Sequence, residues 1–177
     1  MAVTNLMKGF TDNFEVYYDS VRQLGIATVD LGDFKPKTVT ITGAGILGDF
    51  NMPSAPNMEN LEITIHWRTI TGDLTVLSQD KAHSLTLMSS QRNYDSGTGL
   101  LDYQGMEIFF RGLPANLKLG KLEQSSSTES DNTFTVDYLK LSVNGTELLE
   151  FDRFNYIWKV NGSDYTQKIR ANLGYGF

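Results

Sequence analysis

Residues 43–48 carry the spacing G-x-G-x-x-G, which in dinucleotide-binding folds follows a strand and opens a helix. The N-terminus of that helix presents backbone N–H groups to a pyrophosphate. Here the glycines follow an expected strand over residues 38–42, but Pro53 and Pro56 occupy the stretch in which the helix would run. Proline removes a helical hydrogen bond and clashes with the preceding turn. The pattern therefore predicts a flexible loop, and no nucleotide site.

Two histidines and the absence of cysteine limit metal and nucleophilic chemistry in this chain. Neither His66 nor His83 has an acidic residue at the short spacing of a metal motif. The chain lacks a G-x-S-x-G elbow, and the serines of residues 125–127 lie in a polar stretch without periodicity. Asp95 and Asp102 flank a glycine-rich turn, but their spacing does not match an EF-hand loop. We therefore predict no catalytic residue, no metal and no cofactor.

Phe151, Phe154, Tyr156 and Trp158 form an aromatic stripe near the C-terminus. On a strand, residues 154, 156 and 158 would share one face, which could stack against sugar rings. A stripe of this kind is more commonly used in a core or a subunit interface. A core or a subunit interface is therefore the preferred interpretation, and sugar binding stays as an alternative.

Asn144-Gly145 lies between two runs rich in aromatic and β-branched residues, which is the strongest hairpin signal in the sequence. A two-residue turn would place Leu141 opposite Leu148 and Tyr138 opposite Phe151. Both faces of the hairpin would then be partly apolar, which a sheet with one face in water does not need. We expect a second layer or a neighbouring subunit to cover the hairpin. Asn144 and Asn161 also begin formal glycosylation sequons, which we interpret as plain turns.

The length of 177 residues allows one domain with a substantial core, which we assign to residues 1–177. Hydrophobic residues make up 40% of the chain, as in globular proteins. The net charge of −6 argues against tight, sequence-independent binding of nucleic acid. No apolar run reaches the roughly 18 residues of a membrane span, and residues 1–10 lack a signal-peptide pattern. We expect the chain to be made in a cytoplasm.

Short strands separated by turns dominate the remaining pattern, without the long helices of a parallel α/β sheet. The predicted fold is mainly β, a small β-sandwich or barrel-like domain of two packed antiparallel sheets with one or two short helices. Strands are expected at residues 14–18, 21–31, 38–42, 61–67, 85–94 and 106–111, besides the hairpin. The other expected elements are an N-terminal arm (1–12), an extended interface loop (43–57), a short helix (73–79), a polar loop (121–132) and a C-terminal helix (163–174).

The C-terminal third resembles the major tail tube proteins of contractile-tailed phages and R-type bacteriocins. The resemblance rests on D-Y-L-K-L-S-V-N-G-T-E-L-L-E-F-D at residues 137–152, K-V-N-G-S-D at 159–164 and K-I-R-A-N-L-G at 168–174. Upstream, the glycines at 43–45, the pair Gln91-Arg92 and the run Phe110-Arg111-Gly112 agree in order. The similarity extends over about residues 14–174.

This resemblance implies a structural subunit without enzymatic activity or cofactor. The implied assembly is a hexameric ring, and stacked rings form the inner tube of the tail. Each subunit would contribute strands to one closed barrel around a lumen. The implied partners are the sheath around the tube, the baseplate and terminator proteins at its ends, and DNA that passes without specific binding in a phage. The implied location is a virion tail or bacteriocin particle, assembled in the host bacterial cytoplasm.

The resemblance also directs the choice of candidate residues. Apolar side chains in a stretch without a core pattern are costly to leave in water, which favours an interface. The predicted interface residues are Gly43, Gly45, Ile46, Leu47, Phe50, Met52, Tyr156 and Trp158. The predicted lumen-facing residues are Thr38, Thr40, Ser89 and Gln91. Three alternatives stay open: a carbohydrate-binding β-sandwich, a secreted type VI secretion ring protein, and an esterase-like or metal-dependent enzyme using His66 and His83.

Overall fold

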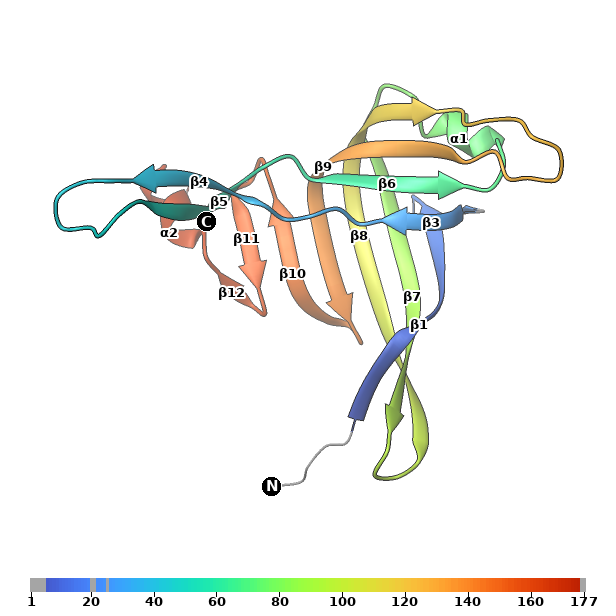
Figure 1. Ribbon diagram of the computed structural model, residues 1–177, viewed down its shortest axis with the longest axis horizontal. Helices are drawn as coiled ribbons and strands as arrows, with labels where there is room; N and C mark the ends of the chain where they lie inside the picture. Colours follow the sequence, from blue (N-terminus) through green and yellow to red (C-terminus); the bar gives the residue numbers. More distant parts are fainter. Residues whose placement is uncertain (1–5, 20–21, 25, 176–177) are drawn as a thin grey trace.

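The computed structural model describes residues 6–19, 22–24 and 26–175, which form two antiparallel sheets and two short helices (Figure 1). The strands are β1 (Leu6–Tyr18), β2 (Arg22–Leu24), β3 (Ile26–Asp30), β4 (Pro36–Ile41), β5 (Phe50–Met58), β6 (Glu62–Trp67), β7 (His83–Asp95), β8 (Leu100–Lys118), β9 (Ser130–Val143), β10 (Thr146–Asp152), β11 (Ile157–Val160) and β12 (Ser163–Asp164). The helices are α1 (Gly72–Val76) and α2 (Gln167–Asn172). This architecture confirms the predicted mainly β, sandwich-like fold with short helices.

The large sheet has the strand order β12-β11-β10-β9-β8-β7-β1-β2, and it branches at β9. The first half of β9 pairs with β6, its second half pairs with β10, and β8 accompanies both halves. β3 in turn pairs with β6. β3 and β6 therefore form a second layer over part of the large sheet.

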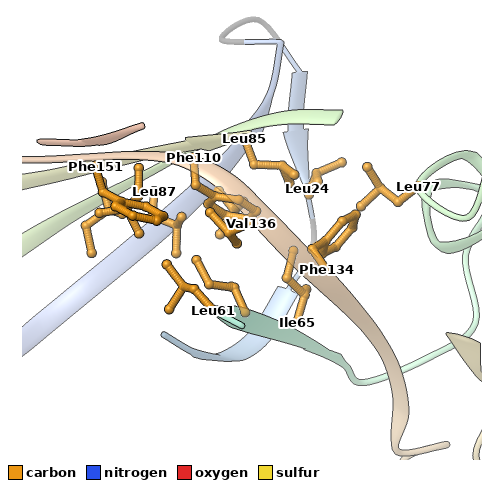
Figure 2. Packing of buried hydrophobic residues seen from close by; sticks show 14 of the residues in the cluster. Leu24, Leu61, Ile65, Leu77, Leu85, Leu87, Phe110, Phe134, Val136 and Phe151 are labelled. Atoms are coloured by element: carbon orange, nitrogen blue, oxygen red, sulfur yellow. The ribbon is translucent and has the colours of Figure 1, made fainter. Parts of the chain in front are cut away.

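The core lies between these two layers. Figure 2 shows Phe110 and Val136 of the large sheet close to Leu61 and Ile65 of the β6 segment. β9 alternates buried and half-buried side chains from Ser130 to Val136, as expected for a strand that passes between neighbours with one face in the core.

Helix α1 closes one end of the core with Leu74 and Leu77, which are both buried. Asn132 fixes the helix to β9 through its side chain. Its Oδ1 accepts a hydrogen bond from Trp67 Nε1 at 2.9 Å, and its Nδ2 donates to Ser78 Oγ at 2.9 Å. A buried amide of this kind is tolerated because its polar atoms have partners.

The prediction of a loop over residues 43–57 is wrong for the second half of this range, because residues 50–57 belong to β5. β5 pairs with β4 as a separate two-stranded sheet. Pro53 and Pro56 argued against regular structure, but proline is compatible with an edge strand, and both strands of an isolated pair are edges. The residues between Ile41 and Phe50 form the turn of this hairpin.

The Asn144-Gly145 turn is confirmed: Val143 pairs with Thr146 across two residues with φ of 49° and 76°. The register beyond the turn differs from the prediction, since a β-bulge follows Glu147. A bulge sets two residues of one strand against one of the other. Instead of the predicted pairs, Leu141 lies opposite Leu149, Leu139 opposite Phe151, and Tyr138 opposite Asp152.

Several element ends also differ from the sequence-based expectations. Residues 6–12 of the expected arm form the first part of β1, and residues 1–5 lie outside the described part of the chain. The expected strand at 21–31 is divided into β2 and β3, with residues 21 and 25 outside the description. The C-terminal helix begins later than predicted, with Thr166 as N-cap, because Ser163 and Asp164 pair with β11. Helix α1 begins at Gly72, one residue before the predicted start, with Thr71 as its N-cap.

The aromatic stripe separates into a core part and a surface part. Trp158 packs against Phe34 and Phe151, with ring centroids 5.3 Å and 6.1 Å apart. Tyr156 is 43% exposed, has a positive φ of 52° and contacts the ring of Tyr175. These rings do not form one flat platform, so the structure gives the carbohydrate-binding alternative no support.

This separation predicts different outcomes for two charge substitutions. Trp158→Glu should lower the free energy of unfolding by roughly 3 kcal/mol, because it removes a large packed ring and places a charge beside the core. Tyr156→Glu should change the same quantity by less than about 0.5 kcal/mol, as expected for a surface position. Urea unfolding followed by circular dichroism measures both. Equal losses for the two variants would contradict the assignment of Tyr156 to the surface.

Candidate assembly surfaces

The β4–β5 hairpin is amphipathic and projects from the body of the protein (Figure 1). Val39 pairs with Met52 and Ile41 with Phe50, so these four side chains share one face. Their exposed fractions are 61%, 52%, 36% and 53% respectively. On the other face, Thr40 Oγ1 donates a hydrogen bond to Asn51 Oδ1 at 2.7 Å. The hairpin thus has an apolar face that its own chain leaves largely uncovered.

The glycine-rich motif forms the tip of this hairpin. Gly43, Gly45 and Gly48 have φ values of 147°, 95° and 87°, a backbone region that favours glycine. No helix begins here, as Pro53 and Pro56 predicted. Leu47 at the tip is fully exposed, with a relative accessibility of 107%, and Ile46 is 42% exposed. The tip therefore extends the apolar surface of the hairpin.

Six of the eight predicted interface residues lie together on this hairpin: Gly43, Gly45, Ile46, Leu47, Phe50 and Met52. The remaining two lie at its base, where a hollow of about 230 Å³ is lined by residues that include Met58, Tyr156 and Trp158. Trp158 belongs mainly to the core. The role of all eight in an interface stays a prediction.

The predicted lumen residues fall into two groups. Thr38 and Thr40 lie on the side of the hairpin opposite to its apolar face. Ser89 and Gln91 lie on β7, on the same face as the buried Leu85 and Leu87. Ser89 and Gln91 are half-buried, and Gln91 Nε2 contacts Met106 Sδ at 3.5 Å. The structure does not bring the two groups onto one surface. Their exposure to a lumen stays a prediction.

The sequence did not reveal a polar surface that covers the outer face of the large sheet. Ion pairs connect its strands: Arg111 with Asp137 at 2.9 Å, Lys140 with Glu147 at 3.1 Å, and Lys159 with Glu150 at 2.6 Å. The hydrogen bond from each cation to its carboxylate raises the pKa of Arg111 and of Lys159. A hollow of about 360 Å³ on this face is lined by Thr86, Glu107, Phe109, Lys140, Ser142, Gly145 and Glu147. We call this surface the polar face.

Tyr138 lies on the polar face and contacts the ion pair of Glu150 and Lys159. Its hydroxyl donates a hydrogen bond to Glu150 Oε1 at 3.1 Å. Burial, together with the charge of Glu150, raises the pKa of Tyr138 to about 12. Tyr138 therefore stays neutral at physiological pH, and the charges of this surface come from its acidic and basic residues.

The C-terminal segment is fixed to the large sheet by Arg170 and Asp164. The guanidinium of Arg170 pairs with the Asp164 carboxylate and donates to the Tyr156 carbonyl at 2.8 Å. The hydrogen bond from Arg170 lowers the pKa of Asp164 to about 2, and the Thr166 backbone N–H contributes. Helix α2 is therefore held in place at neutral pH, although none of its residues is buried.

His66 joins three strands through its two ring nitrogens. Nδ1 lies 2.6 Å from Asp131 Oδ1 on β9, and Nε2 lies 3.0 Å from Asp30 Oδ2 on β3. Lys118 also contacts Asp131, at 3.3 Å. Both ring nitrogens donate only when the imidazole is protonated. The hydrogen bond to Asp30 raises the pKa of His66 above its ordinary value of 6.5, and Asp131 contributes in the same direction.

Neither carboxylate was detectable as a partner of His66 from local sequence spacing, since both are far away along the chain. The arrangement is an ion-pair bridge, and the described residues contain no group of acidic and histidine side chains suited to a metal ion. His83 is buried, and its Nδ1 lies 3.1 Å from the Tyr18 hydroxyl. The two histidines are on separate hydrogen-bond networks, which gives the enzyme alternative no shared site.

The His66 bridge predicts a loss of stability at alkaline pH. The pKa of His66 is raised in the folded state. The contribution of the bridge to stability is therefore complete below pH 6.5 and decreases as the pH rises through the folded-state pKa. We expect the bridge to contribute roughly 0.5–1 kcal/mol to the free energy of unfolding, as for partly exposed ion pairs. His66→Gln should remove this part of the pH dependence of Tm, measured by calorimetry. Glu62→Gln, on the same strand, serves as control and should keep the wild-type profile. An unchanged profile for His66→Gln would contradict the bridge.

No helix among the described residues is long and apolar enough to cross a membrane.

Comparisons with known proteins identify the family of this chain. Residues 11–174 match the family "Phage tail tube protein FII". The tail tube protein of Escherichia phage P2 is 25% identical over 166 residues, which cover 90% of this chain and 93% of the relative. The major tail tube protein of Serratia phage KSP20 is 26% identical over 178 residues, which cover 99% of both.

A solved structure shows the same fold at lower sequence identity. It is a chain from the PVC sheath/tube terminator of an extracellular contractile injection system in the extended state. The TM-score is 0.51 and the identity 17%, with 74% of this chain and 94% of that chain covered. The match over residues 11–174 includes the hairpin, the polar face and helix α2. The chain therefore belongs to the phage tail tube protein FII family, and it is a structural tube subunit of a contractile tail, not an enzyme.

Proposed function

We propose that this protein forms hexameric rings that stack into the inner tube of a contractile tail and enclose a conduit. The sheath surrounds this tube, the baseplate and terminator proteins bind its ends, and assembly takes place in the cytoplasm of the host bacterium. The observation that carries the proposal is the amphipathic β4–β5 hairpin, whose apolar face is left largely exposed by the described part of the chain. A projecting apolar surface of this kind marks a protein interface.

Open strand edges support a closed ring. β2 covers β1 only from Val16 to Tyr18, so within the described residues the rest of the same edge of β1 has no neighbouring strand. Such edges present unpaired N–H and C=O groups, and closing a barrel removes them. About four strands from each of six subunits, spaced about 4.8 Å and tilted about 40°, give a backbone diameter of roughly 48 Å. A bore on the order of 35–40 Å admits duplex DNA.

We assign the lumen to the polar face of the large sheet, which differs from the prediction of Thr38, Thr40, Ser89 and Gln91. Most of the inner face of the same sheet is occupied by the core. On the polar face, Arg111, Lys140 and Lys159 are each paired with a carboxylate, and Glu107 adds a further negative charge. Phosphate binding needs available cations. DNA, where the particle carries it, would pass such a surface without being held.

Electron microscopy tests this proposal. The purified chain should form stacked rings at high concentration, and a cryo-EM reconstruction should place Glu107 and Lys140 on the lumen surface. Glu107→Lys should leave tube formation unchanged, because the residue would face solvent in the bore. Strictly monomeric protein would contradict tube assembly. Tubes with Glu107 on their outer surface would contradict the lumen assignment alone.

A further inference from the structure

Strand pairing does not set the direction in which the β4–β5 hairpin leaves the body of the protein (Figure 1). The chain enters the hairpin from β3 through residues 31–35 and returns to β6 through residues 59–61. At the base, the Glu59 N–H donates to the Lys35 carbonyl at 2.8 Å, which joins the two halves of the hairpin to each other. Across the described residues, no ladder of backbone hydrogen bonds joins β4 or β5 to the large sheet. The angle of the hairpin must therefore depend on side chains.

Apolar packing holds the base of the hairpin but does not fill it. Phe34, which precedes β4, contacts Phe151 and Trp158, with ring centroids 5.6 Å and 5.3 Å apart. Met58, at the end of β5, is buried in the core cluster. The hollow of about 230 Å³ nevertheless remains between the base and the C-terminal strands. Since apolar contact is non-directional, packing around a hollow leaves the angle of the hairpin open.

Arg153, in the turn between β10 and β11, supplies a directional contact at this base. Its Nη2 donates a hydrogen bond to the Glu59 carbonyl at 2.9 Å, and its Nη1 donates a longer one to the Met58 carbonyl at 3.4 Å. The guanidinium also lies over the ring of Phe151, 5.4 Å from its centroid. The donors of an arginine lie in one rigid plane. Bonds to two successive carbonyls therefore define an orientation as well as a distance.

The turn that carries Arg153 is itself fixed to the large sheet. The Arg153 backbone N–H donates to the Asp137 carbonyl of β9 at 2.9 Å. Asp152 is 6% exposed, and its Oδ1 accepts hydrogen bonds from the N–H groups of Phe154 and Asn155 at 3.0 Å and 2.9 Å. Arg153 thus reaches from a well-bonded turn of the body to the base of the hairpin.

We propose that Arg153 fixes the direction in which the β4–β5 hairpin projects. It holds the carbonyls at the end of β5 and so prevents the hairpin from tilting into the hollow beside its base. A surface that is held in position before it meets a partner loses less conformational freedom on binding. Arg153 is thus a positioning residue that prepares the hairpin for assembly, and this consequence rests on the proposed function.

Distances between two spin labels, measured by electron paramagnetic resonance on dilute, unassembled protein, test the direction of the hairpin. The absence of natural cysteine allows labels at chosen pairs of exposed positions. Thr40→Cys/Met88→Cys connects the hairpin to the large sheet, and Met88→Cys/Tyr165→Cys connects β7 to the residue that follows β12. With Arg153 present, both pairs should give one narrow distance distribution. Arg153→Met removes the donors, so the first pair should lose its narrow peak while the second keeps it.

Arg111→Met is the matched control for this experiment. Arg111 is on β8 of the same sheet and pairs with Asp137, so its replacement should leave both distributions narrow. A narrow distribution for the first pair in Arg153→Met would overturn the proposal. Broadening of both pairs in Arg153→Met would also overturn it, because Arg153 would then stabilise the fold as a whole.

Tube formation followed by light scattering tests the consequence for assembly. Arg153→Met should raise the concentration needed for tubes about tenfold, as expected for the loss of a hydrogen bond from a charged group. Arg153→Lys keeps the charge without the planar pair of donors and should lie between Arg153→Met and the wild type. Assembly of Arg153→Met at the wild-type concentration would overturn the role in assembly. A wild-type chain that never assembles would overturn the proposed function, while the label distances still decide whether Arg153 sets the direction.

Discussion

Strand β9 is the element on which the two layers depend. It pairs with β8 over nearly its whole length, with β6 over its first half and with β10 over its second half. Any change in its register would displace both layers, since each is hydrogen-bonded to it. Phe134, Val136 and Leu139 are buried at the point where the partner changes from β6 to β10. The divergence of β6 from β10 creates the space that this core fills.

The same divergence explains why the sandwich is incomplete. β3 and β6 cover only the part of the large sheet near the first half of β9, and the inner face beyond β3 stays open as a hollow of about 530 Å³. Full burial of a large apolar side chain contributes about 1.5–3 kcal/mol, so covering Val39, Ile41, Phe50 and Met52 would contribute roughly 4 kcal/mol of transfer free energy. The translational and rotational freedom lost on association offsets much of this gain, so a contact through the hairpin alone would be weak.

Weak single contacts suit the proposed tube. Two subunits held by one hairpin would separate readily, whereas a subunit that joins a ring on a stack makes several contacts at once. Linked contacts multiply in strength because the later ones form at high effective concentration. If the proposed tube is held by such contacts, free subunits would therefore persist until a ring or another template is present. The exposed Leu47 at the tip is compatible with this, since a single exposed leucine is common on protein surfaces.

Local signals were readable from the sequence, and long-range ones were not. The Asn144-Gly145 turn was predictable because the dipeptide itself demands positive φ. The partners of His66 were not, because Asp30 and Asp131 reach it only through the pairing of β3, β6 and β9. The separation of Trp158 from Tyr156 depends on the positive φ of Tyr156, which ends the alternation expected for a continuous strand. The apolar residues of the hairpin could be identified because they lie in a stretch without a core pattern. Their position on one face could not be predicted, because it depends on the pairing of β4 with β5.

The bulge after Glu147 shows how much one residue decides in this fold. Without it, the two-residue turn would put Phe151 opposite Tyr138, on the polar face, and Glu150 opposite Leu139, in the core. A shift of one residue exchanges the two faces of a strand. With the bulge, Phe151 is 3% exposed in the core, and Glu150 receives hydrogen bonds from Tyr138 and Lys159. The backbone N–H of Asn161 donates to the Leu148 carbonyl at 2.7 Å, so the next turn of the chain helps to hold the bulge. The dry inner face and the charged outer face of the sheet therefore depend on the same local irregularity, which no pattern of alternating residues could reveal.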